Sequence, residues 1–105
     1  MGQSNSEQQR VLQLLGGLIR RAGQLVTGSE LVLRGIQKEQ VNYVFVASDS
    51  SATTRKQFTD KCNSHKIELS FDFNRTQLSV AIGIQRSVVA VTGKGFSKKI
   101  AQLLK

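Results

Sequence analysis

Residues 25–34 read Leu-Val-Thr-Gly-Ser-Glu-Leu-Val-Leu-Arg, a short apolar strand followed by a turn and the start of a helix. Thr27 and Glu30 have the T-x-x-E spacing of a capping box, which predicts a helix over about 28–39 with Thr27 as its cap. Gly28 lets another molecule approach the backbone closely. The free N–H groups of such a helix start can bind phosphate or a base edge, although most T-x-x-E motifs are simple caps.

Strand and helix patterns alternate regularly around this stretch. Residues 41–47 (VNYVFVA) and 87–92 (SVVAVT) are nearly continuously apolar, which is typical of strands covered on both faces. The short strand at 25–26 and the alternating strand at 67–71 have the features of sheet edges. This order predicts an α/β fold, a three-layer α-β-α sandwich with a small mixed four-stranded sheet.

Helices are expected over about 7–22, 28–39, 52–65, from Asn74 to Gly83 and over 96–104. In the first of these, Ser6 and Gln9 form a second capping box, and the Gly16-Gly17 pair indicates a closely packed neighbour. Residues 1–5 are interpreted as a flexible lead and 6–105 as one domain. The apolar stripe expected to face the core in the first helix consists of Val11, Leu12, Leu15, Leu18, Ile19 and Ala22.

The charge of the chain is positive and unevenly distributed. Fifteen Lys and Arg against seven Asp and Glu give +8, and residues 73–105 contain six basic residues and no acid. Such an asymmetry indicates a polyanionic partner, and the spread of the cations over several elements favours nucleic acid over a membrane surface. A basic protein that is merely kept soluble by its charge remains the alternative.

Catalytic and metal-binding patterns are missing. The single cysteine, Cys62, and the single histidine, His65, are three residues apart, too few ligands for a zinc site and without the partners of a nucleophilic pair. Gly93-Lys94-Gly95 lacks the spacing of a phosphate-binding loop. We therefore expect no enzyme, no cofactor and no metal, and we expect Cys62 to be a buried core residue beside a surface histidine. Without a signal peptide or an apolar run of about 20 residues, we expect no membrane association and a cytoplasmic monomer.

The chain resembles the kink-turn-binding ribosomal protein superfamily of the archaeal "L-seven-Ae" and eukaryal "L-thirty-e" type, and within it the bacterial YlxQ-like branch. The resemblance covers about residues 8–105 and rests on the order of LLGGLIRRAGQLVTG (14–28), GSELVLRGI (28–36), VFVASDSS (44–51), DKCNSHKI (60–67), the L-x-x-A-x-G of Leu78-Ala81-Gly83 and VVAVTGKGF (88–96). It implies an α-β-α sandwich that binds RNA without catalysis.

The resemblance also implies where RNA binds. In the family, a G-x-N-E-x-x-K-like segment opens the second helix and reads the sheared G·A pairs of a kinked stem. Here Gly28 matches the glycine and Arg34 the lysine, while Glu30 falls on the asparagine and Leu31 on the glutamate position. The family's second contact is a loop that corresponds to residues 83–87, in which Ile84 can pack on a base and Arg86 can hold phosphate. The predicted RNA-binding residues are Gly28, Ser29, Glu30, Leu31, Arg34, Lys38, Ile84, Gln85 and Arg86.

Two other classes of function stay open at this point. A protein-docking accessory factor of the translation or transcription machinery is favoured by Leu31, an apolar residue at a site that is polar in the family. A small-molecule site at Asp49-Ser50-Ser51 is the weaker possibility, because a Ser/Asp loop at a strand end usually only caps a helix.

Overall fold

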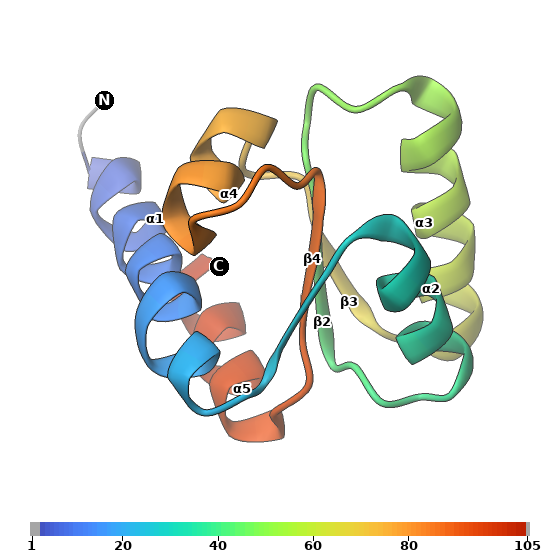
Figure 1. Ribbon diagram of the computed structural model, residues 1–105, viewed down its shortest axis with the longest axis horizontal. Coiled ribbons are helices and arrows are strands. Elements are labelled where there is room, and N and C mark those ends of the chain that lie inside the picture. Colours follow the sequence, from blue (N-terminus) through green and yellow to red (C-terminus); the bar gives the residue numbers. More distant parts are fainter. Residues whose placement is uncertain (1–2, 105) are drawn as a thin grey trace.

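A four-stranded mixed sheet crosses the middle of the molecule in the order β1-β4-β2-β3 (Figure 1). We describe residues 3–104 in a computed structural model. β4 (Val88–Val91) pairs antiparallel with both β1 (Leu25–Thr27) and β2 (Tyr43–Val46), and β3 (Glu68–Ser70) pairs parallel with β2. The two nearly all-apolar strands are central and fully buried, and the two short ones are edges, as predicted.

Helices cover both faces of this sheet. α1 (Gln3–Leu14), α4 (Arg75–Ile82) and α5 (Lys94–Leu104) lie on one face, and α2 (Ser29–Gln37) and α3 (Ala52–His65) lie on the other (Figure 1). The predicted α-β-α sandwich is therefore confirmed. Each face has its own apolar core, because successive side chains of a strand point to opposite sides.

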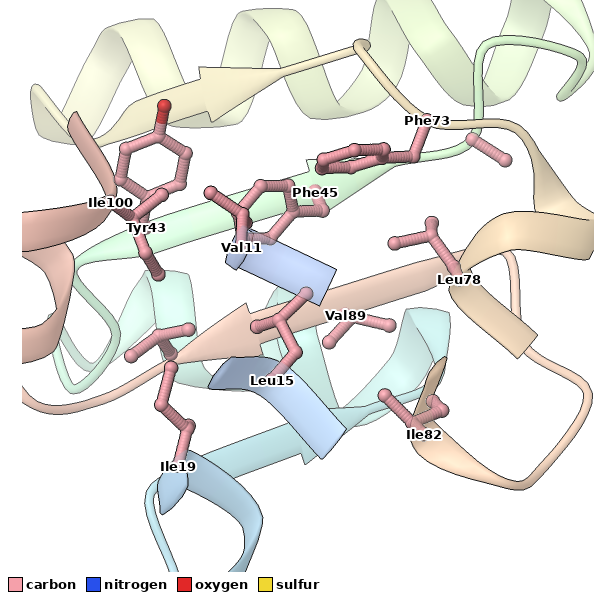
Figure 2. Packing of buried hydrophobic residues seen from close by; sticks show 12 residues of the cluster. Val11, Leu15, Ile19, Tyr43, Phe45, Phe73, Leu78, Ile82, Val89 and Ile100 are labelled. Atoms are coloured by element: carbon pink, nitrogen blue, oxygen red, sulfur yellow. The ribbon is translucent and has the colours of Figure 1, made fainter. Parts of the chain in front are cut away.

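The larger core lies under α1, α4 and α5. Tyr43 and Phe45 stack with ring centroids 4.9 Å apart, and Phe73 lies 5.8 Å from Phe45 (Figure 2). Burial raises the pKa of Tyr43 to about 12, with Glu68 and Asp72 adding to the effect. The smaller core, on the α2–α3 side, contains Cys62 among aliphatic side chains and Phe58.

The first helix differs from its prediction at both ends. It begins at Gln3, so Ser6 lies inside it rather than capping it, and the expected lead at 1–5 overlaps it at 3–5; residues 1–2 lie outside the described part of the chain. α1 continues into a π-helical turn, η1 (Leu15–Ile19). Because a π-turn closes at i+5 instead of i+4, the apolar stripe changes phase: Leu15 and Ile19 stay buried, whereas Leu18 is 56% exposed. The expected burial of Leu18 and Ala22 is therefore wrong.

The Gly16-Gly17 pair explains how α4 approaches this turn. A Cβ built on Gly16 would lie 1.9 Å from the carbonyl oxygen of Ala81 in α4, whereas one on Gly17 would meet nothing within 4 Å. The expected close neighbour is thus present at Gly16 but not at Gly17.

Most predicted helix ends are confirmed. Ser51 caps α3 by accepting from the Thr54 N–H at 3.2 Å, and Asn74 and Gln77 form a reciprocal capping box on α4. Gly83 ends α4 with φ 80°. The last helix, expected over 96–104, begins two residues earlier, at Lys94.

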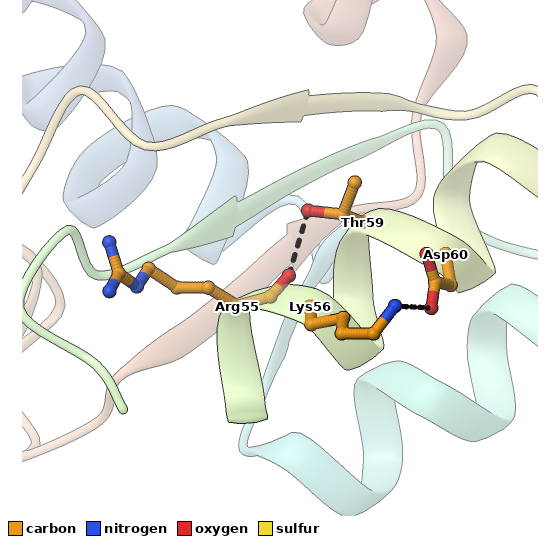
Figure 3. Close-up of polar contacts among 4 residues, drawn as sticks. All are labelled: Arg55, Lys56, Thr59 and Asp60. Atoms are coloured by element: carbon orange, nitrogen blue, oxygen red, sulfur yellow. Dashed lines mark hydrogen bonds and ion pairs between the residues drawn. The ribbon is translucent and has the colours of Figure 1, made fainter. Parts of the chain in front are cut away.

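The solvent face of α3 is held by local contacts. Lys56 forms an i,i+4 ion pair with Asp60 at 3.3 Å, and the Thr59 hydroxyl donates to the Arg55 carbonyl oxygen at 2.7 Å (Figure 3). Both residues of the ion pair are strongly exposed, so this pair contributes little to stability.

Among the described residues, no helix has the length and apolar character needed to span a bilayer.

Candidate nucleic-acid interface

Three helices begin along one edge of the sheet. β1 and β2 both run opposite to β4, and β3 runs parallel to β2, so β1, β2 and β3 end at the same edge, where β4 begins. Each of the three is followed by a helix, and the starts of α2, α3 and α4 therefore lie at this edge. A helix start has a partial positive charge, so this edge favours an anionic partner. Side chains cap the starts of α3 and α4, whereas that of α2 has no side-chain cap.

Gly28, and not Thr27, is the cap residue of α2. Gly28 has φ 95° and ψ 143°, no side chain caps the first turn of α2, and the Val32 N–H donates to the Gly28 carbonyl oxygen at 3.0 Å. The predicted capping box between Thr27 and Glu30 is thus wrong. The physical reason is that Thr27 is the last residue of β1, paired with Val89, so the helix starts later. The first turn of α2 therefore has no side-chain cap.

The 83–87 loop lies directly beside this helix start. The Gly28 N–H donates to the Val88 carbonyl oxygen at 2.9 Å, and a Cβ built on Gly28 would lie 3.6 Å from Arg86 Nε. The loop is fastened to α4, because the Arg86 N–H donates to Ser79 Oγ at 3.1 Å and Ser79 Oγ donates to the Arg86 carbonyl oxygen at 3.3 Å. Arg86 is thus held against Gly28, and its Nη1 donates to the Gln85 carbonyl oxygen at 2.8 Å.

Most of the other predicted site residues surround this contact. Ser29, Glu30 and Leu31 are exposed in the first turn of α2, with Leu31 55% exposed, and Ile84 and Gln85 are exposed in the loop. Arg34 is six residues beyond Gly28, about 9 Å along the helix axis, and lines a groove with Leu31, residues of β1 and Thr92.

Lys38 is the exception. It is the residue at the other end of α2, about 15 Å along the helix axis from Gly28 at 1.5 Å per residue. Glu30 and Arg34 lie four residues apart on α2 but do not form an ion pair, so that carboxylate does not neutralise the Arg34 guanidinium.

Two further arginines lie at the loop. Arg75 Nη1 donates to Ser87 Oγ at 2.6 Å, and the backbone N–H of Arg75 donates to Asp49 Oδ1 at 2.9 Å. Arg20 Nη1 would lie 3.4 Å from a Cβ on Gly83. Arg75 could have been found from the sequence, because it directly follows the cap of a helix that starts at a strand end. Arg20 could not, since only the packing of η1 against α4 brings it to the loop.

We call this surface, made of the α2 start and the 83–87 loop with Arg20, Arg34, Arg75 and Arg86, the arginine edge. Two acidic residues lie at this surface: Glu30 in the first turn of α2, and Asp49 between β2 and α3, whose Oδ1 accepts the backbone N–H of Arg75. Four arginines against these two carboxylates leave the arginine edge cationic, and Leu31 of α2 and Ile84 of the loop are its exposed apolar side chains.

The thiol and imidazole groups lie elsewhere and do not form a reactive pair. Cys62 is free and buried, and burial raises its pKa to about 11. His65 Nδ1 lies 3.2 Å from Glu39 Oε2, so the imidazole contacts the turn that follows α2. Among the described residues, no group of three or more His, Cys, Asp and Glu side chains could hold a metal ion.

Comparison with known proteins gives consistent relatives. The model of the ribosomal protein L7Ae/L30e/S12e/Gadd45 family matches residues 12–101. "RNA-binding protein YlxQ" of Enterococcus faecium is 34% identical over 101 residues, which is 96% of this chain and 97% of that protein. "RNA-binding protein YlxQ" of Bacillus subtilis (strain 168) is 39% identical over 89 residues, 84% of this chain and 89% of that protein.

Solved structures agree with this assignment. A protein of unknown function from Bacillus halodurans C superimposes with a TM-score of 0.85 at 43% identity, covering 90% of this chain and 96% of that one. The Giardia lamblia 15.5kD RNA binding protein superimposes with a TM-score of 0.76 at 12% identity, covering 96% of this chain and 84% of that one, which shows a shared fold. The chain belongs to the ribosomal protein L7Ae/L30e/S12e/Gadd45 family, in its YlxQ-like branch.

Proposed function

We propose that this protein binds structured RNA at the arginine edge and catalyses no reaction. The single observation that supports this most is the position of Arg86 beside Gly28. It places a cationic side chain of the 83–87 loop next to the start of α2, which no side chain caps. Phosphates would accept from the first-turn N–H groups and from the guanidinium groups, and the exposed Ile84 would pack on an unstacked base. Two relatives at 34% and 39% identity are named as RNA-binding proteins, which supports the same assignment.

The arginines can be tested by electrophoretic mobility shift with a kink-turn RNA. We expect Arg34→Ala combined with Arg86→Ala to weaken binding, and each lost phosphate contact to flatten the log–log salt dependence by about 0.7–0.9. The matched control is Lys94→Ala combined with Lys98→Ala, which removes the same charge from α5. α5 begins beyond the other end of β4, away from the arginine edge. Unchanged affinity in the double arginine variant would show that the site is wrong.

The kind of RNA is a finer question. We propose a kinked stem held mainly through its phosphates, because Glu30 and Leu31 replace the family's base-reading pair by a carboxylate and an apolar side chain. An RNA whose sheared G·A pairs are replaced by Watson–Crick pairs should then bind within about tenfold of the kink-turn. Restoring the family pair with Glu30→Asn and Leu31→Glu should widen this ratio, and a ratio that is already large in the parent would contradict phosphate-dominated binding.

The exposed Leu31 favours a second candidate function, docking on a protein of the translation or transcription machinery. A partner that stays bound after nuclease treatment and is lost on Leu31→Ser would support docking.

We further propose that the protein acts as a monomer in the cytoplasm, which is in keeping with its one free, buried cysteine. Light scattering at several concentrations tests the monomer.

A further inference from the structure

A second basic surface lies in the layer of α1, α4 and α5, between α1 with η1 and α5. A groove there is lined by apolar side chains, which we call its floor, and by basic ones, which we call its rim. The floor consists of Leu14, Leu18, Phe96 and Leu103, and the rim of Arg10, Arg21 and Lys99. Leu14 and Leu103 also pack against the larger core, so the floor is supported from below. The arginine edge has no part in this groove.

The residues follow helical spacing on both walls. Arg10, Leu14, Leu18 and Arg21 succeed one another at four, four and three residues, and Lys99 and Leu103 lie four apart on α5. Leu18 is turned outward by the π-helical turn and is 56% exposed, although a regular helix would place it in the core stripe. π-turns often occur at functional sites, and this one brings an apolar side chain to the surface between two cations.

The rim charges lack acidic partners within the described chain. Arg10, Arg21 and Lys99 are exposed, none forms an ion pair among residues 6–104, and no acidic residue lines the groove. Glu7, one turn before Arg10, lies outside the lining. An occupant would therefore need to supply both anionic and apolar groups.

We propose that this groove docks an acidic amphipathic helix of a partner protein. An amphipathic helix lays apolar side chains into such a groove at i, i+4 and i+7, and carboxylates on its flanks would meet the three cations. Three of the four apolar lining residues are aliphatic, and the single aromatic ring, that of Phe96, packs against the larger core. Because single-stranded nucleic acid is bound by stacking successive bases on several exposed rings, this lining favours a peptide. A second copy of this chain would bring like charges together, which disfavours it as the occupant. The distance along the helix axis from Arg10 to Arg21 is about 16 Å, which matches about 11 residues of a bound helix.

The test is selection of displayed random peptides of about 12 residues on the intact protein, followed by fluorescence anisotropy with the enriched sequences. Enriched peptides should combine Asp or Glu with apolar residues at helical spacing. Leu18→Glu and Arg21→Glu should each weaken the binding of these peptides by about tenfold or more. Arg34→Glu is the matched control, because it makes the same charge change on α2, and it should leave the peptide affinity within about twofold.

Several results would overturn the proposal. Peptides without acidic residues, no enrichment, or equal losses with Arg21→Glu and Arg34→Glu would each refute it, the last because bulk charge would then explain binding. Loss of affinity for RNA or for phosphatidylserine vesicles on Leu18→Glu, with peptide binding unchanged, would assign the groove to those ligands instead. Both substituted residues are exposed, and circular dichroism checks that each variant is folded.

Discussion

The Gly16-Gly17 pair gives two substitutions with opposite expected effects on stability. Both glycines lie in η1, but a Cβ on Gly16 would lie 1.9 Å from the Ala81 carbonyl oxygen and one on Gly17 would face open space. Ordinary contacts between heavy atoms lie near 3.5 Å, so Gly16→Ala requires η1 and α4 to separate by more than about 1 Å. Because the obstacle is backbone, no side-chain rotation can relieve it.

The magnitudes follow from general substitution data. Overpacking of this kind costs about 1–3 kcal/mol, and the higher helix propensity of alanine offsets at most about 1 kcal/mol. We expect Gly16→Ala to lower the free energy of unfolding by about 1–2 kcal/mol, which corresponds to about 4–16 °C in Tm at this size. Gly17→Ala should raise the free energy of unfolding by about 0.4–1 kcal/mol, since it restricts the unfolded chain without a clash.

The assay is urea unfolding followed by circular dichroism, because the chain contains no tryptophan. Equal m-values would show that the two variants differ in stability and not in the extent of unfolding. The reasoning is refuted if Gly16→Ala is as stable as the parent, or if Gly17→Ala is the more damaging of the two.

Three further outcomes are expected. Gly28→Ala should lower the free energy of unfolding by about 1–3 kcal/mol, since φ 95° strains any side-chain-bearing residue, and a thermal melt equal to the parent's would contradict this. Asn74→Ala should cost about 0.5–2 kcal/mol by removing the capping box of α4, whereas Asn74→Ser or Asn74→Asp should recover most of it in the same melt. Burial raises the pKa of Cys62 to about 11 in the folded protein. Above about pH 9 the thiol therefore ionises in the unfolded chain first, so the unfolded state binds fewer protons than the folded state. The free energy of unfolding then falls as the pH rises. The contribution of Cys62 to the decrease in the free energy of unfolding approaches about 1.4 kcal/mol per pH unit. In Cys62→Ala, urea midpoints should therefore fall less steeply between about pH 9 and 10. Tyr43, whose pKa is also raised, contributes only at higher pH.

Local patterns in the sequence were sufficient for the layers and for most element boundaries. Continuous apolar runs identified the two central strands, because a strand covered on both faces needs apolar side chains at every position. Cap residues act within a few positions, so Asn74 predicted where α4 begins and the Asp49-Ser50-Ser51 loop predicted where α3 begins, and the structure shows that Ser51 is the cap among these three. The order of these elements then limited the topology to a sandwich.

Contacts between segments distant in sequence decided the remainder. Thr27 has the spacing of a cap but is held in β1 by Val89 of β4, and Leu18 has the spacing of a core residue but is rotated outward where η1 meets Ala81. The arginine edge likewise depends on strand order, which brings Arg86 to Gly28, and on the packing of η1 against α4, which brings Arg20 to Gly83. Propensity and spacing describe only the local free energy of a segment, and a strand partner or a packed backbone several elements away can outweigh it.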